Sequence, residues 1–243
     1  MENVVEERKQ FVEVLTNNID FYSKFWTKTL PNEKFREYST HEKKTKKVYC
    51  FGCEQTIASD LPDEQTWPYL LAKELGSEWR GFNFGKQNSS LQEICRIFYQ
   101  IITSTPPQEY PDAVYFLFPD ILRTEYIGNI GNTPVKYSLL FDTFDTDLAT
   151  LAKYRTYTSM LDTFFYSLRF FNIIKIMCEN RGIKWYWFSC SKDYQKLSNT
   201  ALKKYLDTNT ILDNGTLSVL PSNRVEAMQF TAKRFAALHN ERL

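Results

Sequence analysis

The sequence predicts an α/β fold in which a parallel sheet lies between two layers of helices, a three-layer α/β/α arrangement. From residue 48 onward, short apolar runs alternate with longer segments whose apolar residues recur at helical spacing. Residues 113–118, AVYFLF, are continuously apolar, as expected of a strand covered on both faces. Alternating strands and helices imply right-handed crossovers and therefore parallel strands. With 243 residues, 43% of them hydrophobic and 16% aromatic, the chain can bury a sizeable core.

A separate N-terminal segment precedes this α/β region. Residues 3–30 carry apolar side chains at near-helical spacing and end at Pro31, which predicts one or two amphipathic helices. A polar linker follows, up to about residue 46. We therefore divide the chain into a helical extension with its linker, residues 1–46, and an α/β domain, residues 47–243. An amphipathic extension is suited to docking on a protein partner or on a second copy of the chain.

The elements of the α/β domain follow from apolar runs and from the residues that begin or end helices. Gly76 and Gly182 are typical C-terminal signals, and Ser89, Ser90, Ser222 and Asn223 are typical caps. The expected order is strand 48–51, helix 67–75, strand 79–84, a helix from about 91 to Pro106, strand 113–118, helix 147–180, strand 183–190, helix 191–206 and helix 222–238. Residues 123–146 hold several Gly, Pro, Asp and Thr residues and are expected to form a loop or excursion.

The charge balance excludes some partner classes. The chain has 30 basic and 29 acidic residues and a net charge of +1, so neither nucleic acid nor an anionic membrane is expected to bind it. The basic run Lys43–Lys47 is interpreted as a solvated segment leading into the first strand rather than a phosphate-binding patch. Residues 164–178, the most apolar stretch, contain Arg169 and Lys175 and are therefore not predicted to span a membrane.

The N-terminus and the cysteines indicate the cellular compartment in which the protein is made. MENVVEERKQF is charged and amphipathic, so no secretory signal is predicted. The five cysteines are odd in number and lack the spacing of a disulfide framework. Free thiols in a reducing compartment, and hence cytoplasmic synthesis, are the expectation.

In open parallel sheets the ligand site lies beyond the carboxyl ends of the strands. The residues that follow the predicted strands are therefore the first candidates for function. They are Cys53-Glu54-Gln55, Gly85 to Asn88, Pro119-Asp120, and Ser189 to Ser191. The last group is interpreted as a turn and helix cap rather than a site.

The pair Cys50 and Cys53 has the spacing of a redox CxxC motif. A redox motif needs its first cysteine exposed at a helix N-terminus, where the thiol pKa falls. Cys50 lies within the predicted strand, and the next helix is expected only near Thr66, so buried structural thiols are favoured. With only two histidines, His41 and His239, and neither near a cysteine pair, no metal site is predicted. No cofactor is predicted either.

The same segment resembles the first block of the SGNH (GDSL) hydrolase family, in which a strand ends in Gly-Asp-Ser-x-Thr or Gly-Cys-Ser-x-Thr. Gly52-Cys53-Glu54-Gln55-Thr56 is similar to that block, and the tail Leu61-Pro62-Asp63-Glu64-Gln65-Thr66-Trp67-Pro68-Tyr69-Leu70-Leu71 is similar to the run that follows it in phage and bacterial members. Asn83-Phe84-Gly85 with Asn88-Ser89-Ser90 resembles the second block. Phe118-Pro119-Asp120 stands at the third, and Leu217 to Asn223 is similar to the last. The resemblance covers residues 48–238 and implies a flavodoxin-like (SGNH) sheet.

The family's chemistry is missing from the matching positions. A serine hydroxyl attacks an acyl carbonyl there, with a histidine as base and an aspartate that orients it. Glu54 stands at the nucleophile position, and Leu217 and Leu220 stand at the aspartate and histidine positions. The oxyanion-hole asparagine has no counterpart, although Gly85 remains. The resemblance therefore implies a degenerate triad and a vestigial pocket, whose residues are Cys53, Glu54, Gln55, Gly85, Asn88, Asp120 and Arg123.

Two other chemistries were weighed for these residues. Glu54 and Asp120 could form a glycosidase-like carboxylate pair. Helix capping or an ion pair with a nearby base such as Arg123 is favoured instead. Cys53 lacks a positioned base and is not favoured as a nucleophile. The aromatic runs at 164–166 and 185–188 could bind carbohydrate, but they are favoured as core.

Two hypotheses of function remain at this stage. The first is a catalytically degenerate SGNH-like protein that acts as a binding or structural module and belongs to a phage virion. Its partner, a protein or a second copy, would bind through the N-terminal helices. The alternative is a hydrolase, either a carbohydrate esterase or a carboxylate-dependent glycosidase, that uses non-standard residues.

Overall fold

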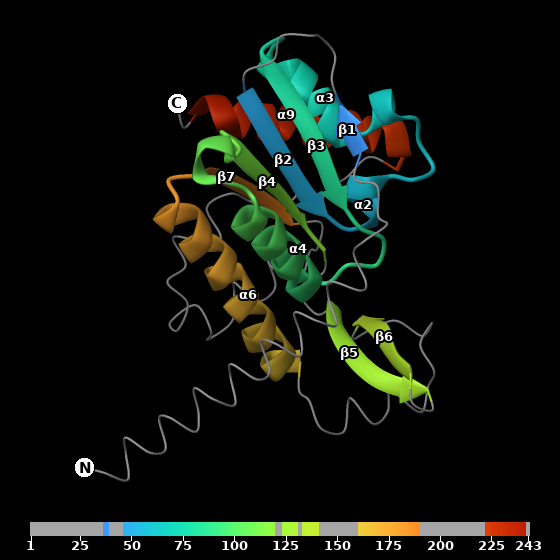
Figure 1. Ribbon diagram of the computed structural model, residues 1–243. Coiled ribbons are helices and arrows are strands. Elements are labelled where there is room, and N and C mark those ends of the chain that lie inside the picture. Colours follow the sequence, from blue (N-terminus) through green and yellow to red (C-terminus); the bar gives the residue numbers. More distant parts are fainter. Residues whose placement is uncertain are drawn as a thin grey trace, which may run out of the picture. The chain divides into compact units, whose positions relative to one another are not determined.

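The computed structural model describes residues 36–38, 46–119, 123–130, 133–140, 160–189 and 222–241 (Figure 1). The helices predicted within residues 3–30 and the helix predicted at 191–206 lie outside the described residues. So do Asp120, Leu217 and Leu220. The division of the chain into residues 1–46 and 47–243 therefore stays a prediction.

Five strands form one sheet in the order β1-β3-β2-β4-β7. Four of them are parallel, namely β3 (Trp79–Gly85), β2 (Lys46–Gly52), β4 (Ala113–Phe118) and β7 (Lys184–Ser189). Counted along the chain, these parallel strands have the spatial order 2-1-3-4, which is flavodoxin-like. The predicted fold class is confirmed.

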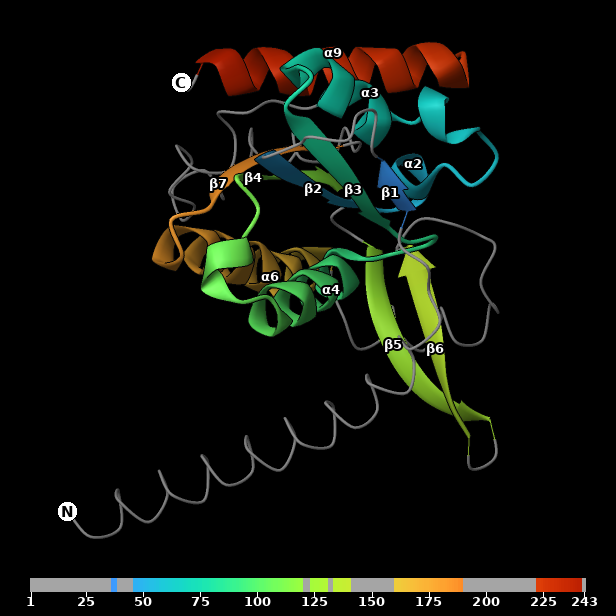
Figure 2. The same cartoon turned by 45° about the horizontal axis from the view of Figure 1, so that its top comes forward.

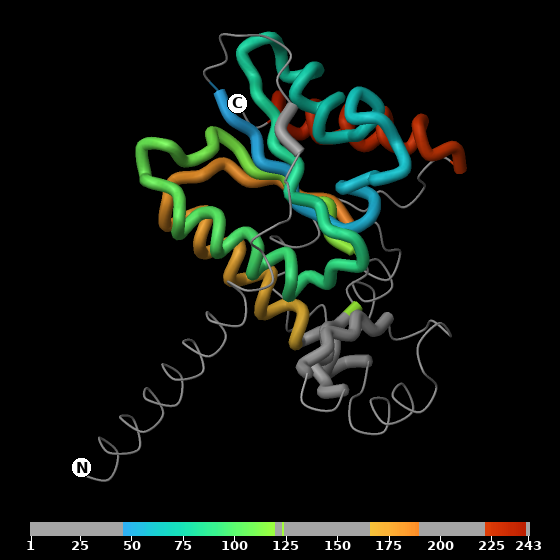
Figure 3. Tube along the Cα trace, turned by 45° about the vertical axis from the view of Figure 1, so that its right-hand side comes forward, coloured from blue at the N-terminus to red at the C-terminus, as the bar shows by residue number. Residues whose placement is uncertain are grey.

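Helices cover both faces of the sheet (Figure 2). On one face α4 (Leu91–Ser104) packs against α6 (Met160–Asn180), and on the other α3 (Trp67–Leu75) packs against α9 (Arg224–Glu241). Figure 3 shows the same separation from another side. None of the described helices is long and apolar enough to cross a membrane.

Alternate residues of the central strands supply the two halves of the core. Val114, Phe116 and Phe118 face the α4–α6 layer, and Ala113, Tyr115 and Leu117 face the α3–α9 layer. Every residue of β4 is at most 1% exposed, which is why its sequence is apolar without interruption. Aromatic rings link neighbouring strands on the α4–α6 side, where Phe51 stacks on both Phe84 and Phe116 at about 5 Å.

The helix boundaries follow the predicted caps. The Ser90 hydroxyl accepts the backbone N–H of Glu93 at 3.1 Å, and the Asn223 side chain accepts the N–H of Val225 at 2.9 Å. Gly76 and Gly182, which end α3 and α6, have φ angles of 121° and 64°, a region that disfavours residues with a Cβ. The caps inferred from sequence are therefore present.

An edge strand and a β-hairpin were not predicted. β1 (Arg36–Tyr38), within the expected linker, pairs antiparallel with β3 at the edge of the sheet. The expected loop at 123–146 contains a hairpin, β5 (Arg123–Ile130) and β6 (Thr133–Leu140). Gly128, Gly131 and Pro134 led to the wrong expectation, since such residues usually mark turns. Here Pro134 is accommodated opposite Asn129 near the turn of the hairpin, where fewer ladder hydrogen bonds are needed.

Candidate functional site at the carboxyl edge of the sheet

A one-turn helix, α2 (Glu54–Ile57), begins directly after β2. The next helix was predicted only near Thr66, and that prediction was wrong. The turn closes through hydrogen bonds from the Ile57 and Ala58 N–H groups to the carbonyls of Cys53 and Glu54, both 3.0 Å long. It ends at Ala58, whose φ of 43° is left-handed. Glu54 is therefore held at the start of a turn, at the carboxyl edge of the sheet.

Two glycines allow α2 to lie on the sheet. A Cβ at Gly52 would collide with the Thr56 side chain, and a Cβ at Gly85 would collide with the backbone of Thr56 and Ile57. Thr56 is fully buried, and its hydroxyl accepts the indole N–H of Trp67 at 3.3 Å. The Asn83 amide donates to the Thr56 carbonyl at 2.8 Å. The turn is thus fixed by contacts with β2, β3 and α3.

The Glu54 carboxylate is bound by Arg123, the first residue of β5. Two parallel hydrogen bonds of 2.9 Å join the guanidinium to both carboxylate oxygens, a bidentate arrangement. The Asn88 N–H also donates to Glu54 at 3.3 Å, and Arg123 reaches the Ser89 carbonyl at 3.5 Å. The Glu54 and Arg123 side chains are 34% and 15% exposed. The pairing anticipated between these two residues is present.

The electrostatics of Glu54 follow from these contacts. Burial raises the pKa of this carboxyl, but the Arg123 hydrogen bonds and positive charge lower it, and the net pKa lies below its ordinary value. Glu54 is therefore ionised at neutral pH, and its charge is balanced by Arg123. An ionised carboxylate saturated by one guanidinium is a poor nucleophile and a poor proton donor.

The two cysteines of the CxxC pair are both buried, Cys50 completely and Cys53 to 3% exposure. Burial, followed by the negative charge of Glu54, raises the pKa of Cys53 to about 12. Burial also raises the pKa of Cys50. Neither thiol forms a thiolate readily at neutral pH, so the interpretation as structural thiols agrees with the structure.

Gly85 does not present a free oxyanion donor. Its N–H donates to the side-chain oxygen of Asn83 at 2.9 Å, within the same strand end. Asn88 adopts a left-handed φ of 57°, and Gln55 is half-buried beside Glu54. The retained glycine therefore serves the packing of α2 on β3 rather than the stabilisation of an anion.

The remaining predicted positions are partly described and partly outside the described residues. Strands β2 and β4 are parallel neighbours, so the position after β4 lies at the same edge as Glu54. Pro119 is buried there. Asp120, at the position that follows, lies outside the described residues. Leu217 and Leu220, which the resemblance places at the aspartate and histidine positions of the triad, lie outside them too. Ser189 is fully buried.

Sequence reasoning missed Arg224, the first residue of α9. Its guanidinium donates to the Glu54 carbonyl at 3.3 Å and forms an ion pair with Asp60 at 2.7 Å. It thereby connects the last helix of the chain to the α2 turn. An arginine at a helix start carries no recognisable signal for such a contact, since carboxylates are the usual residues there.

His239, the histidine that the structure describes, lies away from Glu54. His239 lies in the cavity wall formed by Lys46 and Lys184, the first residues of β2 and β7, and so belongs to the amino edge of the sheet. Its Nδ1 is 2.5 Å from the Tyr115 hydroxyl. His41 lies outside the described residues. Those residues also contain no group of three His, Cys, Asp or Glu side chains arranged to hold a metal ion.

The aromatic run of β7 belongs to the core. Tyr186, Trp187 and Phe188 are each 2% exposed, and Trp185 packs against the α4–α6 cluster. Rings that are buried in this way present no face to a sugar, so the core interpretation is confirmed for this strand.

The chain is similar to solved structures of GDSL-family proteins. One, a lipolytic protein of the G-D-S-L family from Desulfitobacterium hafniense, matches with 15% identity and a TM-score of 0.43, over 80% of this chain and 99% of that one. Another, a member of the same family from Veillonella parvula, matches with 12% identity and a TM-score of 0.33, over 80% of this chain and 97% of that one. No protein-family model matches the sequence, and no curated protein does.

The packing of α2 predicts that Gly85→Ala strongly destabilises the protein. A methyl group there meets backbone atoms, which cannot rotate away, so we expect a loss of about 3 kcal/mol or more in the free energy of unfolding. Gly182→Ala is the matched control. It meets nothing within 4 Å but has a φ of 64°, and we expect a loss of about 1–2 kcal/mol. Urea unfolding measures both. A smaller loss for Gly85→Ala than for Gly182→Ala would contradict the close packing.

The Glu54–Arg123 pair predicts coupled stability losses. Glu54→Gln and Arg123→Gln are each expected to lower the free energy of unfolding by roughly 1–3 kcal/mol at pH 7, because each leaves the charge of a half-buried partner uncompensated. The double variant should lose less than the sum of the two. Additive losses would show that the pair contributes nothing.

The same pair has a defined pH dependence. The folded-state pKa of Glu54 is depressed, so its stabilising contribution is present above its ordinary value of 4.5 and disappears as pH falls through the folded-state pKa. The stability difference between the unmodified chain and Glu54→Gln should therefore shrink below that pH. Glu64→Gln, at an exposed position, is the control and should show no such change.

Proposed function

We propose that this protein is a catalytically degenerate SGNH-like module that binds or organises a partner instead of hydrolysing an ester. The observation that supports this proposal most directly is the state of Glu54. A carboxylate stands where the resemblance places the nucleophilic serine, and both its oxygens accept hydrogen bonds from Arg123 at 2.9 Å. The position that would attack a carbonyl is thus used to attach the start of the β5–β6 hairpin to the sheet.

The neighbouring groups support the same conclusion. A developing oxyanion next to the Glu54 carboxylate would be opposed by its negative charge. The N–H of Gly85 is already bonded to Asn83, and Cys53 is buried with a pKa of about 12. Among the described residues, the nucleophile position and the glycine N–H that acyl transfer would use at this edge are therefore replaced or occupied.

The proposed module acts through a protein partner or a second copy, which docks on the N-terminal segment. A phage origin and a place in the virion, implied by the resemblance of the first block to phage and bacterial members, belong to the same proposal. Carbohydrate is a further candidate ligand for the carboxyl edge.

Turnover of p-nitrophenyl acetate by the full chain tests the absence of ester hydrolysis. We expect the rate to equal that of the buffer, and Glu54→Ser to produce no gain, because a serine without a histidine base remains unactivated. A rate above background that Glu54→Ala abolishes would show that the protein is a hydrolase after all. A rate that Glu54→Ala leaves unchanged would point to a hydrolytic site elsewhere and would equally overturn the proposal.

A truncation tests the role of the N-terminal segment. Removal of residues 1–35 leaves β1, whose residues Arg36–Tyr38 pair with β3. We expect the shortened chain to unfold cooperatively, as the full chain does, but to have lost self-association or partner binding in analytical ultracentrifugation. Removal of residues 1–40 also deletes β1 and should cost additional stability. Loss of folding on removal of residues 1–35 would show that the segment belongs to the core.

A further inference from the structure

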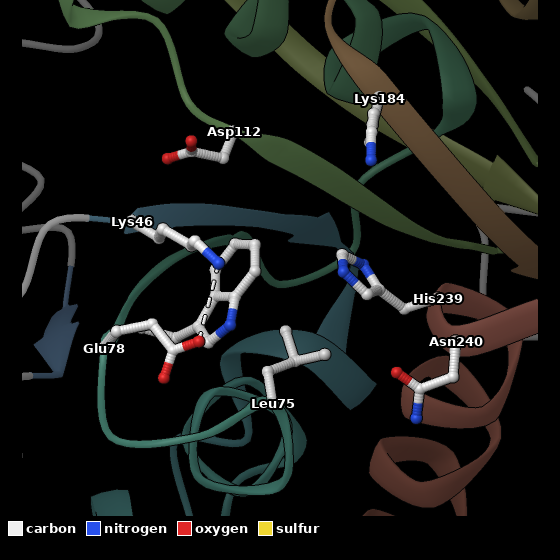
Figure 4. Close-up of a pocket in the computed structure, with 8 residues that line it drawn as sticks. Lys46, Leu75, Glu78, Asp112, Lys184, His239 and Asn240 are labelled. Carbon is white, nitrogen blue, oxygen red and sulfur yellow. Dashed lines mark hydrogen bonds and ion pairs between the residues drawn. The ribbon is translucent and has the colours of Figure 1, made fainter. Parts of the chain in front are cut away.

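A cavity of about 240 Å³ opens at the amino edge of the sheet, where β2, β3, β4 and β7 begin (Figure 4). It is formed by the first residues of strands, by the end of α3 and by the last turn of α9. It does not share residues with the Glu54 site. Its volume is slightly below the range of about 300–1,000 Å³ that is usual for small-molecule sites.

Two carboxylates and a lysine occupy one side of this cavity. Figure 4 shows Asp112, Lys46 and Glu78 on that side. Lys46 is neutralised by Glu78 at 3.5 Å and lies over the Trp79 ring at 5.1 Å from its centroid. Asp112 accepts the Lys47 backbone N–H at 2.8 Å through one oxygen. The second oxygen of Asp112 has no bonded partner among the described residues, so this side carries one uncompensated negative charge.

The opposite side carries two hydrogen-bond donors, Lys184 and His239, and the side-chain amide of Asn240, which can both donate and accept. Figure 4 shows Lys184, His239 and Asn240 there. Lys184 makes no ion pair with any residue that the structure describes, so its ammonium group is an uncompensated positive charge. The His239 ring is only 3% exposed and lies against Trp79 at 5.3 Å, edge to face.

The protonation of His239 follows from its contact with Tyr115. Burial, and then the charges of Lys184 and Lys46, lower the pKa of His239, so the ring is neutral. Burial raises the pKa of Tyr115, which therefore keeps its proton and donates it to Nδ1. A neutral imidazole that accepts at Nδ1 carries its own proton on Nε2. Within the described part of the chain no group accepts that proton, which leaves Nε2 as a donor to the cavity.

The cavity thus has a negative side, a positive side and an apolar floor contributed by Leu75 and Trp79. Its two lysines and two carboxylates sum to zero charge. A ligand with a single charge would match one side and leave the other unmatched or repelled, whereas a small dipolar molecule matches both. We infer that this cavity binds a small zwitterion of the α-amino-acid type, with its ammonium at Asp112, its carboxylate at Lys184 and His239, and an apolar side chain over Leu75 and Trp79.

The test uses the full chain and three probes, L-leucine, L-valine and L-phenylalanine. Because the protein has only two histidines, NMR resolves two sets of imidazole signals, and a His41→Gln variant assigns the set of His239. We expect at least one amino acid to shift the His239 signals saturably and to leave those of His41 unchanged. Absence of a saturable shift with all three amino acids would overturn the inference.

Two analogues of leucine test the dipolar character without changing the protein. 3-Methylbutylamine lacks the carboxylate and 4-methylpentanoate lacks the ammonium group, so each should bind at least about tenfold more weakly than leucine. If 4-methylpentanoate binds as tightly as leucine, the cavity is an anion site and the zwitterion proposal is wrong. Equal binding of the amine would overturn it in the same way.

Variants assign each charge to its side of the cavity. Asp112→Asn keeps an oxygen for the Lys47 N–H and should weaken leucine binding about tenfold while leaving 4-methylpentanoate unaffected. Lys184→Met should weaken leucine and leave 3-methylbutylamine unaffected. Lys73→Met, an exposed lysine of α3 outside the cavity, is the matched control and should change nothing. A loss with Lys73→Met equal to that with Lys184→Met would show a non-specific charge effect and overturn the assignment.

Discussion

The central strands β2 and β4 are covered by helices on both faces. Because of this burial, the Glu54 site and the amino-edge cavity both lie at the ends of the strands. Their apolar side chains alternate between the two helix layers, and the aromatic rings among them stack across the strands. Burying such a sheet requires that its backbone hydrogen bonds be complete and that the polar groups be confined to the strand ends. Among the described residues of the sheet, polar groups that could bind a ligand therefore lie at the carboxyl edge and at the amino edge.

At the carboxyl edge, the polar groups form hydrogen bonds and ion pairs with one another. Glu54 is bonded to Arg123, the Gly85 N–H to Asn83, and the Asn83 amide to the Thr56 carbonyl. Arg224 adds a connection from α9 to the same turn. These contacts join β2, β3, β5 and α9 at one point. A site of this kind stabilises the relative positions of elements that are distant in the chain.

At the amino edge, the opposite arrangement holds. Lys184, one oxygen of Asp112 and Nε2 of His239 lack bonded partners among the described residues, and they line a cavity instead of closing it. The buried Tyr115 hydroxyl orients the imidazole from beneath. The two edges of the sheet thus differ in how many of their polar groups have hydrogen-bond or ion-pair partners among the described residues. That difference is the physical basis for the amino-acid site proposed at the amino edge and for the structural role proposed for the Glu54–Arg123 pair at the carboxyl edge.

Much of the fold could be predicted because the signals were local. The apolar runs predicted the parallel strands, and Ser90, Asn223, Gly76 and Gly182 predicted the helix boundaries. The β5–β6 hairpin was missed because its glycines and proline favour turns, and β1 was missed because three residues of an edge strand carry no pattern. The unusual residue of the site, Glu54 at the end of β2, was also visible in the sequence.

The partners of that residue were harder to predict. Arg123 was identified as a candidate, but the bidentate pairing joins residues 69 positions apart. Arg224, 170 positions from Glu54, and the Tyr115–His239 contact across 124 positions had no sequence signal. By itself, then, the sequence determined the parallel strands, the longer helices that flank them, their caps and the glutamate directly after β2, since each depends on neighbouring residues. Only the tertiary structure decided which charges are paired and which face a cavity, because the order of strands in the sheet brings those distant groups together.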